Sequence, residues 1–208
     1  MGVQGYLWPL SYTVILKDLF NQFDILQLTQ MVQNSPTFTA LKQYLKNCSK
    51  EDLTNDISEL FKRFDLVRDY YQIKLSPQEE TQVSAKYKRI IENEFFPTRG
   101  LGKAKLSVVK KAVTEYRKIC ETPFAVADIM LFYVEQGVKY TNTYGDINEP
   151  FYNSMEHMYE KAVEWIIKHE LQDIFGARCW KIVEETSGIG WGFHDALSDI
   201  YSNAFNNE

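Results

Sequence analysis

Residues 124–144 form the most hydrophobic stretch of the chain, and this stretch restricts the fold more than any other feature. Thr122 and Pro123 precede it, a capping residue and a proline, which is a typical start of an α-helix. Between residues 124 and 134 only Asp128 is charged. A helix this apolar on nearly every side must be surrounded by other elements, so the stretch predicts a buried central helix.

Apolar residues recur at helical spacing through most of the remaining chain, and no segment shows the sustained alternation of a β-strand. Further helix-start signals lie at Ser35-Pro36, Ser49, Ser76-Pro77 and Glu149-Pro150. The sequence therefore predicts an all-α protein, a single bundle of about eight helices around the 124–144 helix.

One narrow polar stripe interrupts the central helix, formed by Asp128, Glu135 and Lys139 at spacings of seven and four. Glu135 stands four residues before Lys139, which is the favourable order for an ion pair along a helix. The simple interpretation is that the stripe faces water. The alternative is that its carboxylates are partly buried and line a cavity.

The first residues differ from the rest of the chain. Residues 7–16 are apolar for too short a length to span a bilayer, and no basic residue precedes them as an export signal requires. We expect residues 1–34 to be an N-terminal helical appendage and residues 35–208 to form the all-helical domain. Three dispersed cysteines without a CxxC pair favour a reducing, cytoplasmic location with no membrane association.

The net charge of −5 is unevenly distributed. Residues 86–118 hold ten lysines and arginines against three glutamates, which gives +7 there and, from the total of −5, −12 elsewhere. Lys103, Lys105, Lys110 and Lys111 lie in its second half. Such a segment is either a solvated face or a surface for an anionic partner. Nucleic acid is the less favoured partner, because the chain as a whole is acidic.

Two turn segments near the carboxyl end, residues 144–154 and 187–195, combine glycine, aromatic rings and acids more densely than a simple connection needs. Each of them opens a helix. We expect the two turns to meet and to form an aromatic and acidic cleft. Its expected binding residues are Tyr144, Tyr152, Asn153 and Trp191.

His194, at the start of the last helix, is the candidate catalytic residue, with Asp195, Asp146 and Glu149 as the acids that could meet it. A histidine between carboxylates can act as a general acid or base, or as a metal ligand. This hypothesis requires His194 to lie within about 8 Å of a carboxylate outside its own helix, since proton transfer needs hydrogen-bond reach or one bridging water. Otherwise His194 only caps and packs.

The sequence completes no metal-ligand spacing, phosphate loop or nucleophile elbow. The glycines between residues 188 and 192 open a helix as a phosphate-binding loop does, but a helix and not a strand precedes them. No cofactor and no metal site is therefore predicted.

The two turn segments also resemble the signature of a known family. Residues 144–154 and 186–195 are similar to motifs of a bacterial family of small helical proteins described only as a domain of unknown function, and residues 41–53 and 94–97 resemble its earlier segments. The resemblance covers residues 36–205. It implies a bacterial, soluble, all-helical protein, and it implies no activity.

Two hypotheses about function follow. The leading hypothesis is a non-catalytic interaction module, which holds a protein or an anionic partner on the basic segment or in the cleft between the two turns. The alternative is a small-molecule or metal-dependent enzyme centred on His194, with Asp146, Glu149 and Asp195 as its acid, base or metal groups.

Overall fold

A computed structural model describes residues 36–205 of the 208-residue chain. Within these residues it contains α-helices and one short 3-10 helix, and no β-strand. The elements are α2 (Phe38–Asn47), α3 (Lys50–Arg63), α4 (Asp65–Leu75), η1 (Pro77–Glu79), α5 (Glu80–Phe95), α6 (Leu106–Ile119), α7 (Pro123–Tyr144), α8 (Glu149–Lys168), α9 (Gln172–Glu184) and α10 (Phe193–Phe205). The predicted all-α class is confirmed, whereas the predicted appendage at residues 1–34 lies outside the described residues.

Contacts between residues divide the chain into two units, with the boundary between Glu59 and Leu60 in α3. Ser49 and Asp52 begin α3 with the predicted capping box, because each side chain accepts a hydrogen bond from the other residue's backbone N–H, at 3.1 and 3.0 Å. Neither α2 nor α3 contains a buried residue. Their apolar stripes are present but largely exposed: Phe38, Leu41, Tyr44, Leu45, Ile57, Leu60 and Phe61.

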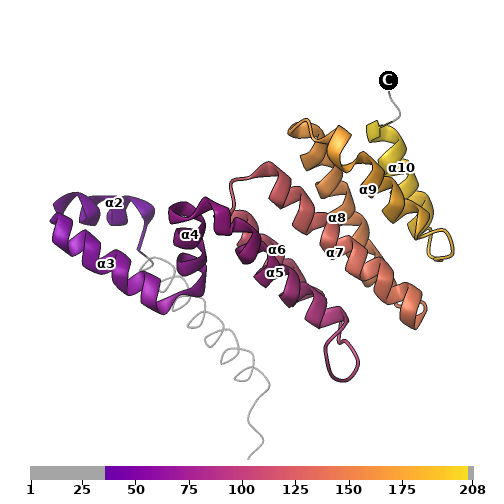
Figure 1. Cartoon of the computed structure of the whole chain (residues 1–208), viewed down its shortest axis with the longest axis horizontal. Helices are drawn as coiled ribbons and strands as arrows, with labels where there is room; N and C mark the ends of the chain where they lie inside the picture. Colours follow the sequence, from indigo (N-terminus) through magenta and orange to yellow (C-terminus); the bar gives the residue numbers. More distant parts are fainter. Residues whose placement is uncertain (1–35, 206–208) are drawn as a thin grey trace, which may run out of the picture. The chain divides into compact units, whose positions relative to one another are not determined.

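The carboxyl-terminal unit is built around α7, as the sequence predicts. The side chains of Ala127, Ile129, Met130, Leu131, Tyr133 and Val134 are fully buried. The helix packs against α5, α6, α8 and α9, and α10 packs against α8 and α9. Figure 1 shows α5 beside α6 and α7 beside α8 in this unit.

One short connection, residues 145–148, sets the close antiparallel packing of α7 and α8. Gly145 ends α7 with a positive φ of 87°, which glycine adopts without strain, and its N–H donates to the Thr141 carbonyl at 2.8 Å. The Asn148 side chain caps α8 by accepting from the Phe151 N–H at 3.0 Å. Gly137 of α7 lies directly against the Met155 side chain of α8, so the two helices approach closely there.

The polar stripe of α7 does not simply face water. Its two carboxylates, Asp128 and Glu135, are partly buried, as the alternative interpretation of the sequence expects. Asp128 and Glu135 both bind Arg178 of α9, at 2.7 and 2.6 Å, and Asp128 also binds Lys88 of α5 at 2.6 Å. Lys139 lies over the Phe96 ring, 4.7 Å from its centre, and has no ion pair with Glu135. A cation from another helix therefore neutralises Glu135, rather than the lysine one turn away.

Candidate functional site

The two turns near the carboxyl end lie against each other. An ideal Cβ built on Gly190 would lie 3.8 Å from a carboxylate oxygen of Asp146, and the Trp191 ring stacks on the Tyr152 ring with 6.4 Å between centres. Asn142, near the end of α7, donates to the Glu185 carbonyl at 2.9 Å. Segments about forty residues apart in the sequence thus form one continuous corner of the molecule.

Tyr152 organises this corner from a buried position. Its hydroxyl contacts the Thr141 hydroxyl at 2.7 Å, accepts from the Ile147 N–H at 3.3 Å and donates to Asp146 at 3.2 Å. Tyr152 is only 2% exposed, whereas Trp191 above it is 62% exposed. The predicted binding residue Tyr152 therefore braces the turn, and Trp191 is the exposed ring of the corner.

Trp191 has a φ of 65°, a backbone conformation that is rare for a residue with a Cβ, and Gly192 follows with a φ of 68°. The N–H groups of Ile189 and Phe193 donate to the carbonyls of Thr186 and Gly190, at 2.9 and 3.2 Å. These two amides belong to the turn itself, so the segment is a tight connection between helices that presents Trp191 to the surface.

His194 is half-buried and engaged through one ring nitrogen. Its Nδ1 lies 2.9 Å from the Thr186 hydroxyl and 3.2 Å from the Val183 carbonyl. The Thr186 hydroxyl donates to the same carbonyl at 2.6 Å, so the network is satisfied when Nδ1 carries the proton. These contacts make His194 a link between the end of α9 and the start of α10.

The acids proposed beside His194 have other surroundings. Asp146, Glu149 and Asp195 are exposed, and none of them forms an ion pair with His194 among the described residues. Asn153 is exposed as well, and Tyr144 stacks on Phe96 with 6.1 Å between ring centres. In residues 36–205 no group of three or more histidine, cysteine, aspartate or glutamate side chains could hold a metal ion.

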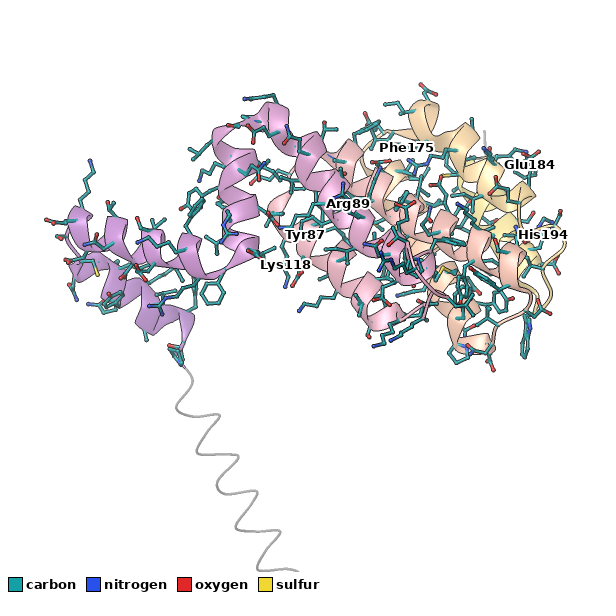
Figure 2. The ribbon with its side chains drawn as sticks, turned by 60° about the horizontal axis from the view of Figure 1, so that its bottom comes forward. Tyr87, Arg89, Lys118, Phe175, Glu184 and His194 are labelled. Carbon is teal, nitrogen blue, oxygen red and sulfur yellow. The ribbon has the colours of Figure 1, made fainter. Side chains whose placement is uncertain are left out.

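The predicted basic segment forms an exposed surface along α6 and the loop before it. Seven basic residues are exposed there: Arg99, Lys103, Lys105, Lys110, Lys111, Arg117 and Lys118. We refer to these seven residues as the basic surface. The opposite side of α6 is buried, through Val109, Ala112, Val113 and Tyr116. Figure 2 shows Lys118, at the end of α6, and His194 at different ends of the carboxyl-terminal unit.

The loop that carries Lys103 and Lys105 is fixed to α5 and α7. The Ala104 N–H donates to the Glu94 carbonyl at 2.9 Å, and the Tyr140 hydroxyl donates to the Gly102 carbonyl at 3.1 Å. These two hydrogen bonds thus hold the loop and its two lysines in place beside α6.

A cavity between α5, α6 and α7 was not predicted from the sequence. It has a volume of about 410 Å³, and Glu80, Tyr116 and Thr122 line it. These residues are separated by up to 42 positions, and none of them belongs to a recognisable motif. Only the packing of the three helices brings them together.

None of the described helices combines the length and the apolar composition that crossing a bilayer requires. Neither the curated proteins nor the solved structures provide a match to this chain. One family model does match, over residues 37–206, and its description is a family of unknown function, DUF6155. The match includes the nine α-helices described within residues 36–205, both turns, the basic surface and the cavity. The chain therefore belongs to the DUF6155 family.

Proposed function

We propose that this protein is a non-catalytic interaction module that holds an acidic protein segment on the basic surface. The observation that carries the proposal is the charge of this surface. Seven cations and one acid, Glu115, lie between residues 99 and 118, a local charge of +6 in a chain whose total is −5. A local charge opposite to that of the whole protein favours a specific, oppositely charged partner over general attraction to polyanions.

The cations of this surface differ from several others in the same unit. Lys86 binds Asp69 at 2.7 Å, Lys88 binds Asp128 at 2.6 Å, and Arg178 binds two carboxylates. These cations are neutralised within the protein, and they stabilise contacts between helices.

On the basic surface, by contrast, only Lys111 pairs its side-chain charge with a carboxylate among the described residues, Glu115 at 3.7 Å, while Lys105 reaches Glu94 only through its backbone N–H, at 3.3 Å. Arg117 lies over the Trp165 ring, 5.4 Å from its centre. The other five cations form no ion pair within residues 36–205, so they are available to carboxylates of a partner. Leu101, which is 76% exposed in the same loop, adds an apolar contact point.

The geometry favours an acidic protein segment over nucleic acid. The exposed side of α6 carries no aromatic residue, whereas proteins that bind single strands stack bases on aromatic rings. The rest of the chain carries −11, from the total of −5 less +6, and it would repel a long polyanion. A helix of 14 residues is about 21 Å long, a length that a short acidic segment can follow.

The hydrogen bonds of His194 agree with a structural role in this module, because its Nδ1 joins Thr186 and Val183. The enzyme hypothesis centred on His194 stays a prediction. We also propose a reducing compartment, such as the bacterial cytoplasm, because Cys48, Cys120 and Cys179 are all free thiols.

Fluorescence anisotropy with the full chain tests the proposal. The probe is a fluorescein-labelled peptide of alternating glutamate and glycine with one central leucine. We expect binding that weakens as salt is added, and a loss of affinity of about tenfold or more in Lys110→Glu with Lys111→Glu. Lys42→Glu with Lys46→Glu on α2 makes the same change of charge elsewhere and should leave the affinity within about twofold.

Two outcomes would overturn the proposal. One is a peptide affinity that is equal in the wild type and in the Lys110 and Lys111 variant, or undetectable in both. The other is clearly tighter binding of a single-stranded DNA of the same charge at the same salt concentration, which would show that the surface binds nucleic acid instead.

A further inference from the structure

The cavity between α5, α6 and α7 has the size and the composition of a small-molecule site. Its volume of about 410 Å³ lies within the range of roughly 300 to 1,000 Å³ that is common for ligand pockets. Ala125 and Phe124 supply apolar walls, and Glu80, Ser84 and Tyr116 supply polar groups. The site is distinct from the basic surface and from the turns near His194.

The Tyr116 hydroxyl is a polar group without a well-aligned hydrogen bond at this cavity. The residue is 0% exposed, and the Ser84 hydroxyl and the Cys120 thiol are its hydrogen-bonding neighbours, but neither forms a bond of regular geometry with it. Burial, together with Cys120, raises the pKa of Tyr116, so its hydroxyl stays protonated and can both donate and accept. Buried polar groups normally have partners, and a bound ligand would provide one.

Glu80 places a negative charge at the same cavity. One of its carboxylate oxygens accepts from the Thr122 hydroxyl at 2.7 Å, and the other accepts from the Cys120 thiol at 3.2 Å. Burial raises the pKa of the Cys120 thiol to about 11, so it remains a donor at neutral pH. Glu80 forms no ion pair with a lysine or arginine among residues 36–205.

The other charges that line the cavity cancel. They are Lys88 and Asp128, which bind each other at 2.6 Å. Glu80 is therefore the uncompensated charge of the site, and a cationic ligand would neutralise it.

We infer that this cavity binds a small primary amine with an apolar body. The ammonium group lies at Glu80 and has three N–H donors, of which one can reach the carboxylate and another the Tyr116 hydroxyl. The apolar body lies against Ala125 and against the ring of Phe124, which is 48% exposed and packs on Phe175 with 5.0 Å between ring centres. A neutral alcohol of the same shape lacks the charge and should bind much more weakly.

Thermal shift and isothermal titration with the full chain test this inference, with 2-phenylethylamine as the probe and 2-phenylethanol as its neutral counterpart. A ligand that binds the folded state raises the melting temperature, and the stabilisation grows with the logarithm of the ligand concentration once this exceeds the dissociation constant. We expect such a rise with the amine, a saturable heat of binding in the titration, and an affinity for the alcohol that is lower by about tenfold or more.

Three substitutions locate the site. Glu80→Gln keeps an acceptor for Thr122 but removes the charge, and it should lower the amine affinity by about tenfold. Tyr116→Phe keeps the ring and should lower it about three- to tenfold. Glu92→Gln removes an exposed charge from the same helix, α5, and should leave the affinity unchanged.

The inference is wrong if the amine does not bind the wild type, or if the alcohol binds as tightly. It is also wrong if neither Glu80→Gln nor Tyr116→Phe weakens the binding of the amine. Because Tyr116→Phe deletes a hydroxyl that forms no well-aligned hydrogen bond, it tests the site even if Glu80→Gln alters the stability of the fold.

Discussion

Arg178 on α9 binds both carboxylate oxygens of Glu135 on α7, through its Nε at 2.6 Å and its Nη2 at 2.9 Å. The same guanidinium reaches Asp128 at 2.7 Å, and Asp128 binds Lys88 of α5 at 2.6 Å. Burial alone would lower the pKa of Arg178, but hydrogen bonds and attraction from Glu135 and Asp128 raise it, so it stays charged. This network joins α5, α7 and α9 through side chains that are 19–28% exposed.

Arg178→Met should destabilise the fold by about 2–3 kcal/mol, because it leaves the Glu135 carboxylate partly buried without its cation. Urea unfolding, followed by circular dichroism, measures the change. Arg68→Met is the matched control, since Arg68 pairs with Asp65 at 2.7 Å on an exposed part of α4 and should cost less than about 1 kcal/mol. Equal losses in the two variants would contradict the role assigned to the network.

Gly102→Ala should distort the loop before α6. A Cβ at this position would overlap the backbone carbonyl of Phe95, which cannot move as a flexible side chain can. We expect a loss of about 1–3 kcal/mol in urea unfolding and weaker binding of the acidic peptide, because Lys103 and Lys105 would shift.

Gly188→Ala is the control for that substitution. A Cβ at Gly188 would meet no atom within 4 Å, and the backbone there does not have a positive φ. The substitution should therefore change the stability by less than about 0.5 kcal/mol. If Gly102→Ala also leaves the stability and the affinity unchanged, the close approach of the loop to α5 is incorrect.

The stability should fall at alkaline pH. Burial raises the pKa of Cys120 to about 11 and that of Cys179 to about 12, from 9.0 for an ordinary cysteine. The folded protein thus holds these protons more tightly than the unfolded chain does. Their contribution is fully present below pH 9 and is lost as the pH rises from 9 through about 11 to 12.

Urea unfolding at a series of pH values checks this expectation. The double variant Cys120→Ala with Cys179→Ala should show a shallower decline above pH 9 than the wild type, whatever its stability at neutral pH. Cys48→Ala, which alters a cysteine outside the core, should decline in parallel with the wild type. Parallel curves for the double variant and the wild type would show that the two buried thiols do not control the decline.

Local sequence patterns were sufficient to predict several elements of the fold. The run of apolar residues around Met130 predicts a buried helix, and Met130 is fully buried in α7. Glu149 and Pro150 predict the start of a helix, and α8 begins at Glu149. Each of these features depends on residues within a few positions of one another, so the sequence is enough.

Contacts between helices could not be predicted in the same way. From spacing alone Glu135 has a partner in Lys139, but its actual partner is Arg178, 43 residues later. The reason is that a helix pattern fixes which side is apolar, whereas the rotation and axial offset of a neighbouring helix decide which side chains meet.

The features of the candidate sites fall into the same two groups, those that local sequence determines and those that helix packing determines. The sequence by itself determined the all-α class, the central helix, the basic segment and the two glycine and aromatic turns, because these depend on local composition and periodicity. Only the tertiary structure decided that His194 binds Thr186 and that Glu80 and Tyr116 share a cavity. Those relationships arise when packed helices bring distant residues together, and no local pattern encodes that packing.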